Sequence, residues 1–355
     1  RACMNPPGLH GTKVARAFED RAALRGDMRS RLTVQTGPVV LTCGMARARE
    51  PLTITNGDVM KKTAFAFAAL LACGVAQADT LSKIKESAAV TMGVRESSGA
   101  LSYTLGDGKY VGYHIEICER VVKAIQKQLG ITAMTTKYQP VTSQNRIPLV
   151  QNGTVDIECG STTNNATRQK DVSFAVTTYV EEVRIATKTS SGITGIAQLN
   201  GKKVATTTGT TSVQTLRKNE RAGGINFDEV YGKDHADSFL LMESGRADAF
   251  VMDGQILAGL ISKSKSPADF KIVGEVLSVE PIAIMFRKDD PEFKKVVDAT
   301  IVGMMQSGEL AKIYDKWFLQ PIPPSNTRVG LPLSDATKAA WASPNDKPME
   351  DYSKK

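Results

Sequence analysis

Hydroxyl and guanidinium side chains gather in three short segments of this chain, at residues 93–98, 142–146 and 160–168. A guanidinium presents a planar fork of N–H donors that matches the two oxygens of a carboxylate. Neighbouring hydroxyls can donate further hydrogen bonds to the same group. The segments therefore predict a site that binds a small carboxylate, with these candidate ligand-binding residues: Arg95, Ser143, Arg146, Ser161, Thr163 and Arg168.

The third of these segments follows residues 154–159, whose alternating, β-rich sequence predicts a strand. Ser161 and Thr163 would then lie in the loop at the carboxyl end of that strand. Open α/β sheets bind their ligands at this end. We therefore expect an α/β fold with the binding site at strand ends.

A helix-to-strand unit occurs twice in the sequence. Residues 149–159 read as a helix end, a glycine stop, a turn and a strand, and residues 241–251 repeat this order 92 residues later. Gly153 and Gly245 each suit a left-handed helix cap. Two copies at this spacing predict two similar lobes that present strand ends to a shared cleft. Asp253 follows the second strand, as the serine and threonine follow the first.

Residues 203–212 predict a strand that passes through a Gly/Thr turn into a helix. Such a turn directs backbone N–H groups and the positive end of the helix dipole toward an anion, and it places Thr211 at the start of the helix. No Gly-Lys-Ser/Thr follows, which excludes a nucleotide-binding P-loop.

Two longer helices are also expected. Residues 115–129 place apolar side chains at helical spacing, so one face of that helix belongs to the core. Nearer the C-terminus, a long helix is expected through Gly303 and Gly308 to Trp317. The remaining tail is expected to be an irregular wrap or a short extra helix.

The net charge of +8 resides mainly in the first 78 residues. These hold 11 Lys+Arg and 5 Asp+Glu, which leaves 34 and 32 for residues 79–355, a net charge of +2. The main part of the chain also lacks a basic patch interleaved with aromatic residues. Nucleic acid is therefore not expected as a partner.

The Gly-Ser-Thr-Thr-Asn-Asn motif with its arginine at residue 168, and the Thr-Ser-Gln-Asn-Arg motif at residues 142–146, resemble a known family. This family is the periplasmic glutamate/aspartate-binding proteins of amino-acid ABC transporters, within solute-binding protein family 3. The resemblance runs from about Asp79 to the C-terminus. It implies a two-lobed periplasmic-binding-protein fold of type II, with the ligand in the interlobe cleft and two hinge crossings.

The resemblance also implies a function. The chain would bind L-glutamate or L-aspartate and deliver it to a membrane permease that has an ATPase partner. No catalytic residue, cofactor or metal is implied, and the protein is expected to be a monomer. Arginine pairing at the far end of the ligand favours these two acids over the amides glutamine and asparagine.

Individual roles follow from the resemblance as well. The α-carboxylate would be bound by one guanidinium and three hydroxyls: Arg168, Ser161, Thr163 and Thr211. Asp253 would bind the α-ammonium group. The side-chain carboxylate would be bound by two guanidiniums and a hydroxyl, with an imidazole nearby: Arg95, Arg146, Ser143 and His235. A hydrogen bond from the imidazole would make binding depend on pH.

Lobe 1 is expected to comprise residues 79–180 and 284–355, and lobe 2 residues 181–283. The hinge segments would lie near residues 179–183 and 279–284. Rotation about two such segments would close the lobes around the ligand. Closure would remove water from the charges and so strengthen their interactions.

Residues 60–78 have the features of a secretory signal peptide: a charged start, a short apolar run and an Ala-Gln-Ala cleavage pattern. The expected location is therefore the periplasm. An alternative is lipidation at Cys73. The apolar run is shorter than the roughly 20 residues that span a membrane. Residues 1–59 are arginine-rich and lack periodicity, and we expect them to be a disordered, non-native upstream extension.

Two of the five cysteines, Cys118 and Cys159, lie in the main part of the chain. They fall in the same predicted lobe, on a helix and at a strand end. In an oxidising compartment a disulfide between them is expected, and the alternative is two buried thiols. No histidine is obviously paired with either, which argues against a catalytic cysteine.

Two other classes of function are alternatives, an enzyme and a sensory module. An enzyme on the same fold, dehydratase-like or cell-wall lytic, needs a positioned general acid or base. Three arginines would instead keep nearby acids ionised, which favours binding. A sensory ligand-binding module would need a membrane span or signalling domain after residue 320, and none follows. At the residue level, Ser161, Thr163 and Asp253 could simply cap helices.

Overall fold

The computed structural model describes residues 79–352. The expected upstream extension at residues 1–59, the expected signal peptide at residues 60–78 and Cys73 all lie outside these residues. Within residues 79–352, no helix combines the length and hydrophobicity needed to cross a membrane.

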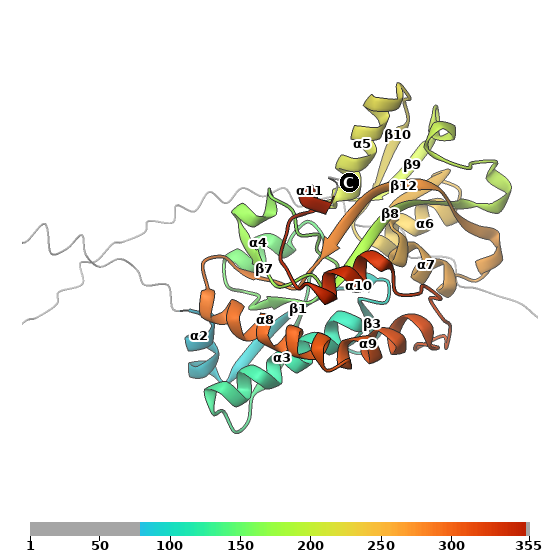
Figure 1. Ribbon diagram of the computed structural model, residues 1–355. Helices are drawn as coiled ribbons and strands as arrows, with labels where there is room; N and C mark the ends of the chain where they lie inside the picture. Colours follow the sequence, from blue (N-terminus) through green and yellow to red (C-terminus); the bar gives the residue numbers. More distant parts are fainter. Residues whose placement is uncertain (1–78, 353–355) are drawn as a thin grey trace, which may run out of the picture. The chain divides into compact units, whose positions relative to one another are not determined.

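Five strands form the first sheet, in the order β5-β1-β6-β13-β7 (Figure 1). Their bounds are β1 Ala89–Val94, β5 Thr135–Pro140, β6 Ile157–Glu158, β7 Val172–Phe174 and β13 Met285–Arg287. β1 pairs in parallel with β5 and β6, whereas β13 pairs antiparallel with β6 and β7. The chain therefore forms the second sheet before it returns to the first sheet as β13.

Five strands also form the second sheet, in the order β10-β9-β11-β8-β12. Their bounds are β8 Tyr179–Lys188, β9 Lys203–Thr207, β10 Asp228–Gly232, β11 Ala249–Asp253 and β12 Phe270–Ile282. All five residues of the central strand β11 are buried, as expected for a strand covered on both faces. The fold is the expected two-lobed α/β type, and each lobe is built on one sheet.

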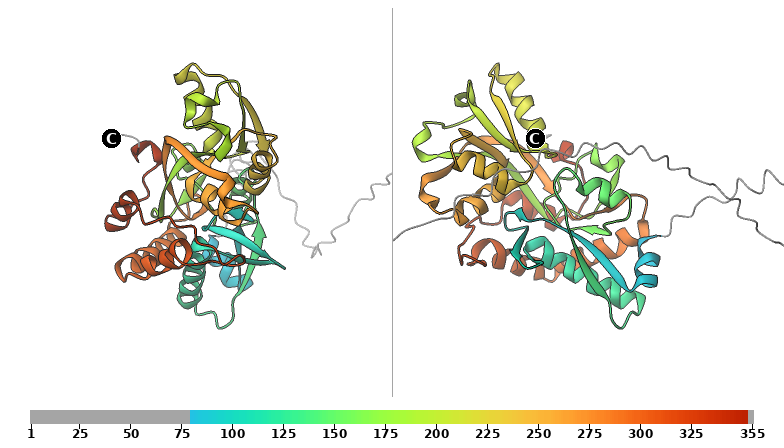
Figure 2. Two further views of the ribbon diagram at one scale, coloured as in Figure 1. Left: turned by 90° about the vertical axis from the view of Figure 1, so that its right-hand side faces the viewer. Right: turned by 180° about the vertical axis from the view of Figure 1, so that it is seen from behind.

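Helices surround each sheet. The helices of the first lobe are α2 Thr80–Ser87, α3 Tyr113–Leu129, α4 Arg146–Gln151, α8 Pro291–Gln306 and α9 Glu309–Tyr314. Those of the second lobe are α5 Thr211–Gly223, α6 His235–Glu243 and α7 Gly254–Lys263. A small sheet, β2 Ser97–Ser98, β3 Ser102–Gly106 and β4 Lys109–Val111, extends the first lobe. Figure 2 shows the yellow α5 at the top of both views and the orange α8 in the lower half.

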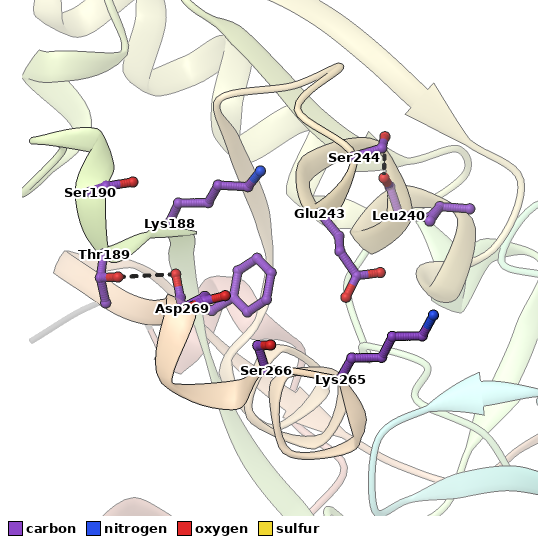
Figure 3. Close-up of a pocket in the computed structure, with 10 residues that line it drawn as sticks. Lys188, Thr189, Ser190, Leu240, Glu243, Ser244, Lys265, Ser266 and Asp269 are labelled. Atoms are coloured by element: carbon purple, nitrogen blue, oxygen red, sulfur yellow. Dashed lines mark hydrogen bonds between the residues drawn. The ribbon is translucent and has the colours of Figure 1, made fainter. Parts of the chain in front are cut away.

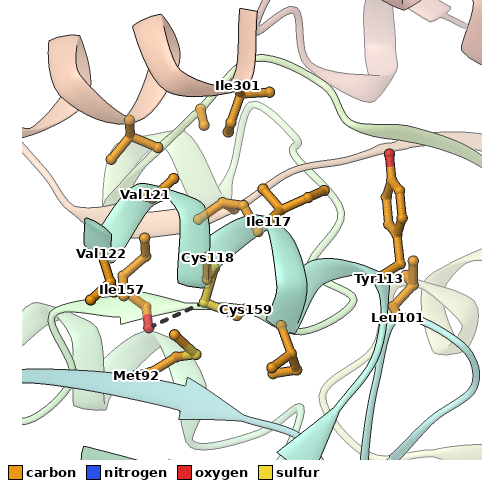
Figure 4. Close-up of a cluster of buried hydrophobic side chains, with 14 of the residues drawn as sticks. Met92, Leu101, Tyr113, Ile117, Cys118, Val121, Val122, Ile157, Cys159 and Ile301 are labelled. Atoms are coloured by element: carbon orange, nitrogen blue, oxygen red, sulfur yellow. Dashed lines mark hydrogen bonds between the residues drawn. A yellow bond between two sulfur atoms is a disulfide. The ribbon is translucent and has the colours of Figure 1, made fainter. Parts of the chain in front are cut away.

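The predicted apolar stripe on α3 is confirmed. Ile117, Cys118 and Val121 are buried in the core of the first lobe (Figure 4). The expected disulfide is also present, because Cys118 is bonded to Cys159 in the segment that follows β6. The disulfide therefore ties α3 directly to the strand end that precedes the serine and threonine motif.

Both copies of the repeated unit form as predicted, from α4 to β6 and from α6 to β11. Gly153 and Gly245 have φ angles of 75° and 76°, the left-handed conformation that ends a helix at little cost. The first strand, however, is shorter than residues 154–159, because only Ile157 and Glu158 pair as a strand.

The expected long helix to Trp317 is wrong. α8 ends at Gln306 and α9 begins at Glu309, with Gly308 between them at a φ angle of 73°. This left-handed glycine redirects the chain and separates the two helices. A five-residue π-helix, Asp315–Leu319, then carries Trp317 into the core.

The chain crosses between the two sheets from β7 to β8 and from β12 to β13. At these crossings β8 and β12 pair antiparallel, with Tyr179 opposite Ile282. The tail forms α10 Asp335–Ala342 and α11 Met349–Tyr352. Trp341 of the tail donates a hydrogen bond of 2.9 Å to the carbonyl of Thr178, so the tail is attached next to one crossing.

Candidate functional site

The three predicted arginines are all buried. Arg95 follows β1, Arg146 begins α4 and Arg168 begins a short 3₁₀ helix, Arg168–Lys170. Their side chains come from different elements of the first lobe, and they are only 0%, 2% and 8% exposed. Burying a charge is costly unless partners compensate for it. The partners of each guanidinium therefore define what the site can bind.

Arg95 reaches residues of both lobes through a single nitrogen. Its Nη2 lies 2.9 Å from the Ser143 hydroxyl, 3.4 Å from Asp234 Oδ1 and 3.1 Å from His235 Nε2. Its Nε and Nη1 are buried and have no hydrogen-bond partner among the described residues. The three N–H groups on these two nitrogens are thus unsatisfied by the protein groups that the structure describes.

Arg146 has the same deficit. Its Nε and Nη1 are buried without a hydrogen-bond partner in the described part of the chain. Burial lowers the pKa of Arg146 well below its ordinary value, and the positive charges of Arg168 and Arg95 lower it further. A guanidinium remains charged at neutral pH even so. The surroundings of Arg146 therefore favour an added anion.

Arg168 is more fully bonded. Its Nη1 donates to the Thr163 carbonyl at 2.8 Å, and its Nη2 donates to the carbonyl of Gly209 at 3.4 Å. Gly209 belongs to the turn between β9 and α5, so Arg168 bridges the lobes. Burial lowers the pKa of Arg168, and the charges of Glu280 and Asp253 oppose that effect.

The hydroxyls of Thr163 and Thr211 have a partner that the sequence did not reveal. They donate hydrogen bonds of 2.6 and 2.7 Å to the same oxygen, Oε2 of Glu280. Ser161 donates to the Ser98 hydroxyl at 3.1 Å. None of these hydroxyls caps the helix that follows, so the simple capping interpretation does not describe them.

Asp253 ends β11 and is 4% exposed. Its carboxylate does not cap α7, although it occupies the N-cap position. Burial raises the pKa of Asp253 to about 7, Glu280 acts in the same direction, and Arg146 opposes it. A cation placed beside Asp253 would favour the ionised carboxylate.

His235 begins α6 and is 1% exposed. Its Nδ1 lies 3.0 Å from the Thr207 hydroxyl, and its Nε2 faces Arg95. Burial lowers the pKa of His235 to about 3, and the charge of Arg95 contributes. The ring is therefore neutral at physiological pH and accepts or donates hydrogen bonds without carrying charge.

Three acidic residues at the site were missed by the sequence reading: Glu181, Glu280 and Asp234. Glu181 on β8 pairs directly with Glu280 on β12, and both are buried. Like charges directly opposite each other destabilise a sheet. The available signal was the acidic residues within the two expected hinge segments, Glu181 and Glu182 in residues 179–183 and Glu280 in residues 279–284.

The two lobes approach closely beside the arginines. Gly209 has a φ angle of 80°, and a Cβ atom at this position would lie 2.7 Å from the Cα of Gln144 on the other lobe. A side chain at Gly160 would likewise collide with Glu158 and with Arg95, whose Cγ would be 2.7 Å away. Gly209 therefore permits the close approach of the two lobes, whereas Gly160 leaves room for Glu158 and Arg95 within the first lobe.

A surface cavity of about 640 Å³ adjoins this region and is lined by Arg168, Thr211 and Tyr231, among others. Figure 3 shows a different cavity, of about 700 Å³, lined by Lys188, Glu243 and Lys265. This second cavity contains none of the predicted site residues.

Among the described residues, no cluster of acidic, histidine or cysteine side chains is arranged to hold a metal ion.

The sequence of this chain is similar to those of known solute-binding proteins. Residues 90–320 match the model of bacterial extracellular solute-binding proteins, family 3. A glutamate/aspartate import solute-binding protein of Escherichia coli strain K12 is 45% identical over 299 residues, covering 82% of this chain and 99% of that protein. An L-glutamate/L-aspartate-binding protein of Pseudomonas aeruginosa is 46% identical over 273 residues, covering 76% and 90% of the two chains.

Solved structures share the fold. An ancestral arginine-binding protein bound to arginine superposes with a TM-score of 0.58 at 27% identity, covering 65% of this chain and 98% of the other. The family match at residues 90–320 includes the three buried arginines and Asp253.

Proposed function

The chain belongs to family 3 of the bacterial extracellular solute-binding proteins, and from this premise we propose that it captures L-glutamate or L-aspartate and passes it to an ABC permease. The curated relatives named above bind these amino acids or import them. Its role is therefore in transport rather than in catalysis.

One observation carries the choice of ligand. The site holds three buried guanidiniums, and Arg95 and Arg146 each retain N–H groups without partners among the described residues. An acidic amino acid carries two carboxylates and one ammonium group, which complements these donors and Asp253. An amide in place of the distal carboxylate would leave buried positive charge uncompensated, which costs several kcal/mol.

The proposed arrangement assigns one end of the ligand to each side of the site. The α-carboxylate lies at Arg168 and the hydroxyls beside it, and the ammonium group lies at Asp253. The side-chain carboxylate lies at Arg95 and Arg146. In this arrangement the hydroxyls of Thr163 and Thr211, each with a single O–H donor, turn from Glu280 to the ligand carboxylate. The set comprises Arg95, Ser143, Arg146, Ser161, Thr163, Arg168, Thr211, His235 and Asp253.

Rotation of the lobes about the two crossings provides the proposed mechanism of capture. Lobe 1 comprises residues 79–180 and 284–355, and lobe 2 comprises residues 181–283. Contacts such as that of Arg168 with Gly209 join the lobes and support a closed form. The proposal has three further parts. The protein is secreted to the periplasm through residues 60–78, it acts as a monomer, and it delivers its ligand to a permease and the ATPase of that permease.

Thermal unfolding against a panel of amino acids tests the proposal. A ligand that binds only the native state raises the unfolding midpoint by an amount that grows with its concentration over Kd. L-Glutamate and L-aspartate should raise the midpoint by several degrees, and L-leucine should not. If neither acidic amino acid shifts the midpoint, the proposed ligand is wrong.

A further inference from the structure

Residues 97–100 of the first lobe project into the second lobe. This segment, which we call the tongue, contains β2 and follows Arg95 by one residue. On one side it meets the beginning of α6. The Ser97 hydroxyl donates to Asp234 Oδ2 and accepts a hydrogen bond of 3.1 Å from the backbone N–H of Ala236.

The other side of the tongue meets the beginning of α7. Gln255 Oε1 accepts a hydrogen bond of 3.0 Å from the backbone N–H of Ala100, and Gln255 Nε2 lies 3.5 Å from the Ser98 carbonyl. Gly99 has a φ angle of 61°, and a Cβ here would lie 2.9 Å from the Gln255 carbonyl oxygen. A Cβ at Gly259 of α7 would lie 3.0 Å from the Cα of Gly99. The tongue thus fits closely against both helices.

The carboxylate of Asp234 interacts with both lobes: with Ser97 and Arg95 of the first lobe and with His235 of its own. Burial works to raise the pKa of Asp234, but its interactions with His235 and Arg95 outweigh burial and lower it. Asp234 does not cap α6 with its side chain, although it stands at the N-cap position. Its carboxylate therefore contributes directly to the contact between the lobes.

We propose that the tongue is a latch: Ser97, Asp234 and Gln255 stabilise the closed form and so set the affinity for the ligand, although none of them is assigned to ligand binding. This inference rests on the proposed function, because it takes ligand capture to occur by lobe closure. The contacts join different lobes, so opening must break them. A protein whose binding-competent form is populated only in part shows a weaker apparent affinity in proportion.

The latch also positions a ligand-binding residue. The nitrogen of Arg95 that faces Asp234 is the one that faces Ser143 and His235. Closing the tongue therefore fixes the guanidinium plane and directs the remaining N–H groups of Arg95 into the site. Asp234 acts on the ligand through Arg95 and is a positioning residue.

A double-mutant cycle tests the latch. The dissociation constant for L-glutamate is measured by calorimetry for the wild type, Ser97→Ala, Asp234→Asn and the double variant. Each single change is expected to weaken binding about tenfold, as for loss of a hydrogen bond to a charged group. The double variant is expected to bind about as weakly as Asp234→Asn alone, since that change already disrupts the Ser97 contact and also affects Arg95.

Measuring the stability of the ligand-free protein distinguishes a latch, which acts only in the closed form, from a contact that stabilises the fold in general. In the ligand-free protein, which is expected to be mainly open, the same cycle measured by thermal unfolding should show no coupling between Ser97 and Asp234. Equal coupling in both measurements, or independent effects on Kd, would overturn the proposal. Asp237→Asn is the matched control, because it removes the same charge from an exposed position on α6.

Two further measurements keep the result interpretable. Gln255→Leu breaks the other side of the tongue and is expected to lower affinity while leaving the fold intact by circular dichroism. Spin labels on the two lobes report the closed fraction directly, which should be lower in Asp234→Asn than in the wild type at equal ligand. A wild type that binds neither acidic amino acid refutes the proposed function, whereas a wild type that binds with no effect of these variants refutes the latch alone.

Discussion

Arg146 is the residue whose surroundings most directly require an anion. Its buried Nε and Nη1 have no partner among the described residues, and two other arginines lie near enough to lower its pKa. A ligand carboxylate would satisfy these donors and offset the repulsion. The affinity of the site for acids therefore depends on keeping this group both buried and charged.

Replacing Arg146 with methionine should remove most of the binding. The change preserves apolar bulk but leaves the ligand carboxylate without a charged partner, which costs about 2–5 kcal/mol. Calorimetry with L-glutamate should show a loss of at least roughly 30-fold in affinity. Arg184→Met is a useful control, because Arg184 lies on β8 outside the arginine cluster. Unchanged affinity in Arg146→Met would contradict the assigned role.

Asp253 should make binding depend on pH. Burial and the charge of Glu280 raise its pKa to about 7, so the carboxyl becomes protonated below that pH and loses its charge for the ligand ammonium group. Affinity for L-glutamate is expected to fall as pH decreases from 8 to 5, by up to about tenfold per unit below pH 7. His235, with a pKa of about 3, remains neutral through this range.

Asp253→Asn provides the comparison. The variant should bind weakly, and its affinity should vary less with pH than that of the wild type when both are followed by calorimetry. An equally steep pH dependence in the two proteins would assign the titration to another group, such as Glu181.

At the scale of elements, β8 and β12 place two glutamates opposite each other at the crossing. Burial raises the pKa of Glu181 well above its ordinary value of 4.5, and Asp253 acts in the same direction. One carboxylate oxygen of Glu181, Oε2, is buried without a hydrogen-bond partner in the described part. The neutral form of Glu181 is therefore favoured by the fold.

Glu181→Gln should stabilise the protein at high pH. Because the folded-state pKa is raised, folding favours the protonated group, and stability decreases as pH rises above about 4.5 toward the folded-state pKa. Glutamine removes this decrease. The thermal midpoint of the variant should match the wild type near pH 4.5 and exceed it at pH 8. The neighbouring Glu182→Gln, half exposed and paired with Arg184, should lack this pattern.

The disulfide joins α3 to the segment after β6 across a sequence separation of 41. A bond that closes such a loop typically contributes about 2–4 kcal/mol to stability. Replacing Cys118 and Cys159 together with alanine should lower the thermal midpoint by several degrees. Ligand affinity should change little, because neither cysteine is among the proposed ligand-binding residues. A midpoint equal to that of the oxidised wild type would contradict the stabilising role.

The elements also show which features a sequence can predict. Gly153 and Gly245 marked both repeated units correctly because a left-handed glycine ends a helix by local geometry alone. Gly308 carried the same signal, yet the expected long helix ran through it to Trp317. β6 was predicted too long because the pairing of a strand depends on its neighbours rather than on its own residues.

Across the whole described part, the fold and the arginine cluster followed from motifs, whereas the partners within the cluster did not. The hydrogen bonds of Thr163 and Thr211 to Glu280 join residues more than 60 positions apart. Contacts of this kind depend on how the two lobes meet. The contacts of Asp234 and Gln255 with the tongue also could not be predicted, because they form only where the two lobes meet.

The most direct test of the central claim is a crystal structure of the protein grown with L-glutamate. We expect the amino acid between the lobes, with its α-carboxylate at Arg168, its ammonium group at Asp253 and its side-chain carboxylate at Arg95 and Arg146. Density for glutamate elsewhere, or a site in which these residues contact no ligand at saturating concentration, would contradict the account.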